Sequence, residues 1–289
     1  MLFLEDRHVT VQLMTLLDTD DWNVFGVAAM RNNLYVLLCN SILIYDAKEP
    51  YNRIGEIKAP QFLYPFDMAA CPRTLCLYIT DDGYHCLWRV DSDNQITRWL
   101  DGLAEPSTVS VSAQTGQVSI VRSGLPSSLE VYDPDGELVH SFQLPEFVAE
   151  PQHAIVTSLG DTIVCYRQCR SKTWGLCRLN SEGELIVKCE LKDTFHHLAA
   201  TPCHLALDEF DRIFVADWQK KIDLFDTELN WDRTLVSSRG DGIERPERIC
   251  FDRHNGLLVV VHAWGKKTYV YKFIAKSIPD NGRKRMNRW

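Results

Sequence analysis

Residues 202–226 read PCHLALDEFDRIFVADWQKKIDLFD and contain three short apolar runs. The runs HLAL, RIFVA and IDLF are separated first by an Asp-rich turn and then by a charged loop that holds one Trp. Runs of this length, rich in Val, Ile and Phe and bounded by polar turns, are typical of strands rather than helices. The stretch therefore predicts three antiparallel strands joined by short connections.

The same pattern recurs five more times, in segments that begin at residues 25, 65, 106, 151 and 246. A fourth run usually follows the third, as in RIGEI, QITRWL and ELVHSFQL. Four strands per unit and a period in the forties are typical of a β-propeller blade. The equivalent positions at the start of the first run, spaced by 41, 41, 45, 51 and 44 residues, are Gly26, Asp67, Thr108, His153, His204 and Arg248.

The sixth unit ends after its third strand, near Phe273. Residues 8–17, HVTVQLMTLL, precede the first unit and have the pattern of an unpaired strand. Pairing this strand with the last blade would close the ring and remove the exposed sheet edges. We therefore predict an all-β, six-bladed propeller over residues 1–274, followed by a basic and disordered tail over residues 275–289.

The unit that opens at residue 202 resembles the NHL repeat, through Pro-x-His-Leu-Ala-Leu-Asp, Arg-Ile-Phe-Val-Ala-Asp and Ile-Asp-Leu-Phe-Asp. FDMAAC, CLYITD and CLWRVD in the second unit are similar, and the other blades match more loosely. Intracellular proteins with this repeat mostly carry the propeller at the end of a tripartite-motif (TRIM) ubiquitin ligase, or bind RNA through it. The resemblance implies a protein-binding module, with RNA binding as an alternative.

The composition, 45% hydrophobic and 24% charged, is that of a globular protein. No run approaches the roughly 18 apolar residues that cross a bilayer, so we expect no membrane contact. The ten cysteines are scattered singly, which indicates small core residues in a reducing compartment. We expect a monomeric, cytoplasmic protein without a cofactor, and GRKRMNR in the tail leaves the nucleus as an alternative location.

The order of strands in a blade assigns loops to the two faces of the ring. The inner strand begins on one face, called the top face here, and the loop from the second to the third strand returns to it. The other two turns lie on the bottom face, where sequences such as DEFDR and DPDGE predict Asp side chains that bond their own backbone.

The top loops of blades four to six carry Trp beside Lys or Arg, a combination that suits an acidic peptide or stacked bases. With eight Lys or Arg and one Asp in residues 266–289, the remaining body has 23 basic and 38 acidic residues, so RNA binding would be weak at physiological salt. The predicted partner surface consists of Arg167, Arg170, Lys172, Trp174, Trp218, Lys220, Lys221, Arg248, Trp264, Lys266 and Lys267.

The strand starts also place polar side chains at the top mouth of the central channel: Asp67, Thr108, His153, His204 and Arg248. The repeat is similar to that of the amidating lyase, whose zinc ligands follow a Pro directly, whereas His153 and His204 each stand one residue later. A shift of one residue turns a strand side chain to the opposite face. We therefore expect the two histidines to bond neighbouring backbone. The alternative is a metal bound by them, with Asp67 on the far side.

No nucleophile motif and no Gly-rich phosphate loop occurs in the sequence. We therefore predict a non-enzymatic binding module or scaffold that uses blades four to six to bind a protein or acidic peptide within a ubiquitin-ligase system. Single-stranded RNA binding on the same face is the first alternative. A metal-dependent lyase or hydrolase at the channel mouth is the second.

Overall fold

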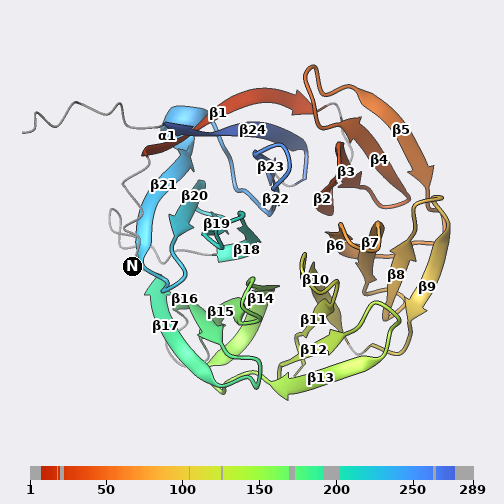
Figure 1. Cartoon of the computed structure of the whole chain (residues 1–289), viewed down its shortest axis with the longest axis vertical. Helices are drawn as coiled ribbons and strands as arrows, with labels where there is room; N and C mark the ends of the chain where they lie inside the picture. The colour runs from red at the N-terminus through yellow and green to blue at the C-terminus, as the bar shows by residue number, and fades with distance from the viewer. Residues whose placement is uncertain are drawn as a thin grey trace, which may run out of the picture.

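The computed structural model describes residues 8–17, 19, 23–103, 105–124, 126–168, 173–191, 202–262 and 265–276. These residues form six four-stranded antiparallel sheets, arranged as blades around a central axis (Figure 1). The one short helix among them is α1 (Ser238–Asp241), which joins the fifth blade to the sixth. The prediction of an all-β, six-bladed propeller is confirmed.

Each blade runs from an inner strand at the axis to an outer strand at the rim. Blade one consists of β2 (Gly26–Met30), β3 (Asn33–Leu37), β4 (Ser41–Asp46) and β5 (Arg53–Lys58). Blade two consists of β6 (Pro65–Cys71), β7 (Cys76–Asp81), β8 (Cys86–Val90) and β9 (Ile96–Leu100). Blade three consists of β10 (Pro106–Val111), β11 (Val118–Arg122), β12 (Ser128–Tyr132) and β13 (Leu138–Gln143). Blade four consists of β14 (Val148–Val156), β15 (Thr162–Gln168), β16 (Trp174–Leu179) and β17 (Leu185–Leu191). Blade five consists of β18 (Pro202–Leu207), β19 (Ile213–Asp217), β20 (Lys221–Phe225) and β21 (Trp231–Ser237). Blade six consists of β22 (Arg248–Asp252), β23 (Leu257–His262), β24 (Lys267–Lys276) and β1 (His8–Leu17).

The ring closes through β1, the outer strand of the sixth blade. Its register with β24 runs from His8 opposite Lys276 to Leu17 opposite Thr268. Figure 1 shows the first and last strands side by side in this blade, β1 in red and β24 in blue. The predicted closure by residues 8–17 is confirmed. The tail beyond Lys276 lies outside the described residues.

The apolar core consists of separate layers between neighbouring blades. Strand β23 shows how the sequence builds them. Leu257 and Val259 pack toward blade one, whereas Leu258 and Val260 pack toward blade five. Side chains alternate along a strand, so a strand buried on both faces has a continuous apolar run such as LLVVV. The inner strands are held rigidly by these layers.

The polar turns of the bottom face bond their own backbone, as predicted. Their Asp or Asn side chain accepts the backbone N–H groups two and four residues further on, which is an Asx turn. This pattern occurs at Asp91, Asp133, Asn180, Asp208 and Asp226. Among the described residues, no helix is long and apolar enough to cross a membrane.

Candidate functional site

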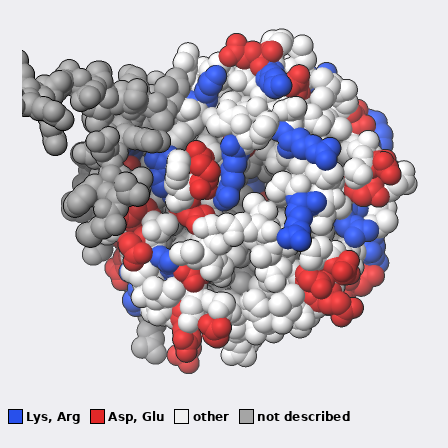
Figure 2. Space-filling model, viewed as in Figure 1, with Lys and Arg blue, Asp and Glu red and all other residues white. Residues whose placement is uncertain are grey.

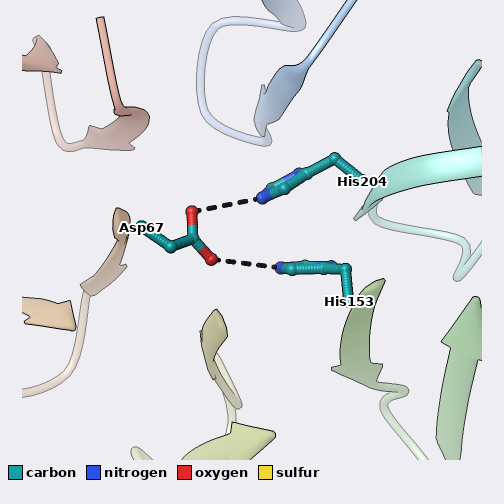
Figure 3. A group of neighbouring side chains, drawn as sticks. All are labelled: Asp67, His153 and His204. Carbon is teal, nitrogen blue, oxygen red and sulfur yellow. Dashed lines mark hydrogen bonds and ion pairs between the residues drawn. The ribbon is translucent and has the colours of Figure 1, made fainter. Parts of the chain in front are cut away.

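Side chains from three inner strands meet at the axis of the ring. The carboxylate of Asp67, from β6, reaches across the channel toward two imidazoles on β14 and β18 (Figure 3). Its Oδ1 lies 3.3 Å from Nε2 of His204, and its Oδ2 lies 3.6 Å from Nε2 of His153. The two rings stack with their centroids 3.8 Å apart. All three side chains are buried.

Backbone hydrogen bonds define the tautomer of both rings. The N–H of Leu205 donates to Nδ1 of His153 at 3.3 Å, and the N–H of Ile249 donates to Nδ1 of His204 at 3.4 Å. A neutral imidazole has one N–H and one lone pair. Because Nδ1 accepts in both rings, the proton of each neutral ring resides on Nε2, directed at Asp67. The expectation that these histidines bond neighbouring backbone is confirmed.

The top end of the channel is covered by Arg248, the first residue of β22. Its guanidinium donates to the carbonyls of Phe25 and Phe66 at 3.0 and 3.1 Å and lies over the Phe66 ring. Its Nε is also 3.7 Å from Oδ1 of Asp67. The guanidinium of Arg248 therefore spans the top end of the channel, above the buried carboxylate and the two imidazoles.

Burial and charge determine which groups are ionised. Burial alone would raise the pKa of Asp67, but its partners His204, Arg248 and His153 outweigh it and lower the pKa to about 2. Burial lowers the pKa of His204, and burial together with His204 lowers the pKa of His153 well below its ordinary value. At neutral pH the group consists of one carboxylate and two neutral imidazoles.

The two imidazoles form the inner end of a cavity of about 270 Å³ that follows the axis toward the bottom face. Apolar residues of the inner strands, such as Ala28, Ala69 and Ile155, form its walls. Its outer end is lined by residues of the bottom turns, including the exposed Arg31 and Arg253. The channel thus opens on the face opposite to the one that the sequence analysis favoured.

The cavity residues of this bottom face are not among the residues predicted from the sequence. The sequence predicts only turn formers in the bottom turns, and Asp252 in DRHNG does bond the backbone of His254 and Asn255. The signal that could have been used is basic: Arg31 and Arg253 directly follow the ends of inner strands β2 and β22. A side chain at that point stands beside the channel.

The Asp67–His153–His204 group has ligand atoms within 4.8 Å of one another, so its fit to a metal ion can be judged. A metal-bound imidazole offers one nitrogen lone pair to the metal and donates its other N–H to an acceptor. Here both Nδ1 atoms face N–H donors, which leaves the proton on the Nε2 atoms that face Asp67. The guanidinium of Arg248 adds a positive charge beside the carboxylate. The group as hydrogen-bonded here does not fit a metal ion.

Thr108, also predicted at the channel mouth, is buried, and its Oγ1 has no hydrogen-bond partner among the described residues. It is not part of the cavity lining. Gly26 occupies the corresponding position in blade one.

The predicted partner surface on blades four to six is partly described. Arg167 pairs with Glu150 at 2.8 Å and lies 6.0 Å from the Trp174 ring, and Lys221 pairs with Asp223. The Trp218 ring is 36% exposed, and the guanidinium of Arg245 lies 4.4 Å above its centre. The side chains of Lys220, Lys266 and Lys267 are exposed, whereas Arg170, Lys172 and Trp264 lie outside the described residues. This surface stays a prediction.

The fold defines a six-bladed β-propeller with a buried titratable group at the inner end of its channel. No protein-family model matches the chain, and no curated protein matches its sequence. Solved structures do match. Virginiamycin B lyase from Staphylococcus aureus, in a catalytically inactive His-to-Ala variant with quinupristin, has a TM-score of 0.65 and 11% identity over 92% of this chain and 100% of that one.

A gluconolactonase from Xanthomonas campestris has a TM-score of 0.66 and 12% identity, over 92% of this chain and 90% of that one. Hydrazine synthase from Kuenenia stuttgartiensis has a TM-score of 0.63 and 12% identity, over 91% of this chain and 98% of that one. At these identities the likeness shows the fold alone. The propeller part of the NHL resemblance is confirmed, but these similar structures are not specifically NHL or TRIM proteins.

The prediction of a non-enzymatic module is corrected here. The similar structures carry the names of enzymes, and a buried cluster of titratable residues is typical of active sites. The sequence predicts Asp67 on the far side of the channel, distant from the histidines. The channel is narrow enough for its carboxylate to reach both rings, so the three residues form one group.

Proposed function

We propose that this chain is a lyase or hydrolase whose reaction takes place at the inner end of the central cavity. The observation that carries the proposal is the pair of buried imidazoles, His153 and His204, which line the cavity and share the Asp67 carboxylate. The enzymes of similar fold support the class of reaction.

In this proposal the imidazoles transfer protons. Their lowered pKa values keep both rings neutral at physiological pH, which is the form that a general base needs. Asp67 faces Nε2 of both rings and is a positioning residue. Its carboxylate orients the rings and stabilises the positive charge that a ring acquires when Nδ1 takes a proton, as in other carboxylate–imidazole pairs.

The atom that would accept the proton is Nδ1. In both rings Nδ1 accepts a backbone N–H at 3.3 to 3.4 Å, beyond the usual range for such a bond. Giving up one bond of this kind costs about 1 kcal/mol. A substrate held in the cavity can therefore compete for the lone pair without unfolding the site. No step of this scheme involves a metal ion.

The proposal is tested with gluconolactone and quinupristin, the compounds that the names of the similar structures point to. Acid release in a pH-stat follows hydrolysis, and mass spectrometry follows cleavage of the peptide. We expect turnover of at least one compound by the full chain. His153→Gln and His204→Gln should each lower kcat by about 100-fold or more. Asp67→Asn should lower kcat as well, with partial recovery in Asp67→Glu.

His262 offers a matched control because it is also buried, and its Nδ1 also accepts a backbone N–H, from Glu244. It does not line the cavity. His262→Gln should therefore leave kcat within about twofold, and a metal chelator should not change the rate. Absence of turnover for both compounds, or full activity of a His153→Gln, His204→Gln double variant, contradicts the proposal.

A further inference from the structure

The geometry of the cavity points to its ligand: we infer that it binds a small organic anion with an apolar body, which enters from the bottom face. The inference deepens the proposed function and rests on it only where the ligand is taken to be the substrate. Three observations carry it: the charge at the cavity opening, the chemistry of the walls and the length of the channel.

The opening is positively charged. Arg31 and Arg253 are exposed and line it, and neither forms an ion pair with any residue that the structure describes. Asp252 is the single carboxylate among the lining residues, and its oxygens accept the backbone N–H groups of His254 and Asn255 and the side chain of Asn255. Figure 2 shows Lys and Arg side chains beside the central hollow, over β2, β6 and β22, and Asp or Glu side chains on its opposite side. This rim favours an anion over a neutral or cationic group.

The walls between the rim and the imidazoles are apolar, with one polar exception. Ser110, on β10, lines the cavity, and its buried Oγ has no hydrogen-bond partner among the described residues. Buried hydroxyl groups nearly always have a partner, so an unpaired one in a cavity wall indicates a polar group of a ligand or a water. The cavity therefore suits an elongated apolar body with one polar atom near its middle.

The length of the channel also determines how long the ligand must be. The N–H of Ile249 bonds His204, and Arg253 stands four residues further along the same strand and turn. At roughly 3.3 Å per strand residue, the imidazoles and the basic rim are about 13 Å apart. An anion bound at the rim can extend its opposite end to the imidazoles, so the charge anchors the ligand and the far end is the part that reacts.

The inference is tested by ligand-observed NMR titration of the full chain with two matched pairs: 4-phenylbutyrate against 4-phenylbutanamide, and octanoate against 1-octanol. We expect each carboxylate to bind at least about tenfold more tightly than its neutral analogue. Arg31→Gln and Arg253→Gln should each weaken carboxylate binding about tenfold, the loss expected for one charged hydrogen bond. Binding of the neutral analogues should not change.

Lys48→Gln is the matched control, because Lys48 is an exposed cation on a turn that does not line the cavity. Equal binding of carboxylates and neutral analogues, no binding of either, or equal losses in the Lys48 and Arg253 variants would overturn the inference. Binding is measured here without turnover. Anion binding without any cleavage of lactone or peptide would support the inferred ligand and contradict only the proposed catalysis.

Discussion

The carboxylate of Asp67 links residues from several blades of the ring. Its carboxylate contacts His153, His204 and Arg248 of blades four, five and six, and accepts the N–H of Val109 in blade three. Five of the six blades therefore meet at one buried charge. A buried charge with several partners stabilises a fold only while the partners remain in place.

Replacing this carboxylate should lower the stability of the fold. We expect Asp67→Asn to lower the free energy of unfolding by about 3 kcal/mol, because an amide leaves Arg248 without its nearby negative charge. Asp133→Asn makes the same chemical change in an exposed turn, where Asn serves as well as Asp, and should cost under about 0.5 kcal/mol. Urea denaturation of the two variants measures both values, and equal losses would argue against a role for Asp67 in stability.

The buried histidines make stability depend on pH. Their pKa values are lowered on folding, so the unfolded chain binds protons more readily. Stability is therefore greatest above the ordinary histidine pKa of about 6.5 and declines as the pH falls below it. Thermal unfolding between pH 7 and pH 5 should show this decline. In the His153→Gln, His204→Gln double variant the slope should be much flatter, and an unchanged slope would mean that the rings are not buried and neutral.

Below that pH range, protonation of Asp67 causes a second loss of folding stability. Its pKa of about 2 in the folded chain is below that of an unfolded aspartate near 3.9. The stabilisation is complete above the unfolded value and is lost as the pH falls through the folded one, roughly 2 to 3 kcal/mol in all. The loss of stability from the histidines therefore begins at about pH 6.5, and the loss from Asp67 begins only at about pH 3.9.

At the scale of strands, the inner strands β2 and β6 approach each other closely at Gly26. A Cβ on Gly26 would lie 2.9 Å from both the Cβ and the backbone N of Met68, closer than such atoms can pack. The absence of a side chain in blade one thus allows the inner strands to close around the axis. The same closeness brings Asp67 within reach of the opposite histidines.

Gly26→Ala should therefore destabilise the fold by about 1 to 3 kcal/mol, the usual cost of overpacking. Gly55 in β5 is the matched control: its nearest neighbour would be a side-chain carbon of Ile44 at 3.5 Å, which is ordinary contact. Gly55→Ala should cost little. Chemical denaturation followed by Trp fluorescence compares the two, and a tolerated Gly26→Ala would show that the two strands can move apart.

For the whole molecule, stability depends on the closing strand. β1 alternates across the sheet, so adjacent leucines differ in environment: Leu17 is 3% exposed and packs in the layer between blades six and one, whereas Leu16 is 51% exposed. The strand joins the first residues of the chain to the last blade. The six blades should therefore unfold together.

We expect Leu17→Ala to lower the free energy of unfolding by about 2 to 3 kcal/mol through loss of buried surface and the resulting cavity. Leu16→Ala removes the same atoms from an exposed site and should change it by under about 0.5 kcal/mol. Far-UV circular dichroism and Trp fluorescence should report one shared transition in both variants. Two separate transitions would indicate that the closing blade unfolds independently of the others.

Local patterns in the sequence were sufficient for the architecture. Alternating apolar runs and Asp-rich turns repeat with a nearly constant period, so each blade can be recognised from its own residues, and strand 8–17 is explained by the missing edge of the last blade. The turn role of residues such as Asp208 also follows locally, because an Asx turn involves only neighbouring backbone.

The site was decided by the tertiary structure. Asp67 and His204 are 137 residues apart, and their contact depends on the width of the channel, which follows from how closely six blades pack. The closure of the top end by Arg248 and the opening of the cavity at the bottom face depend on the same packing. A repeat pattern defines each blade separately. The distance across a closed ring is a property of all six together, so it emerges only when the chain is folded.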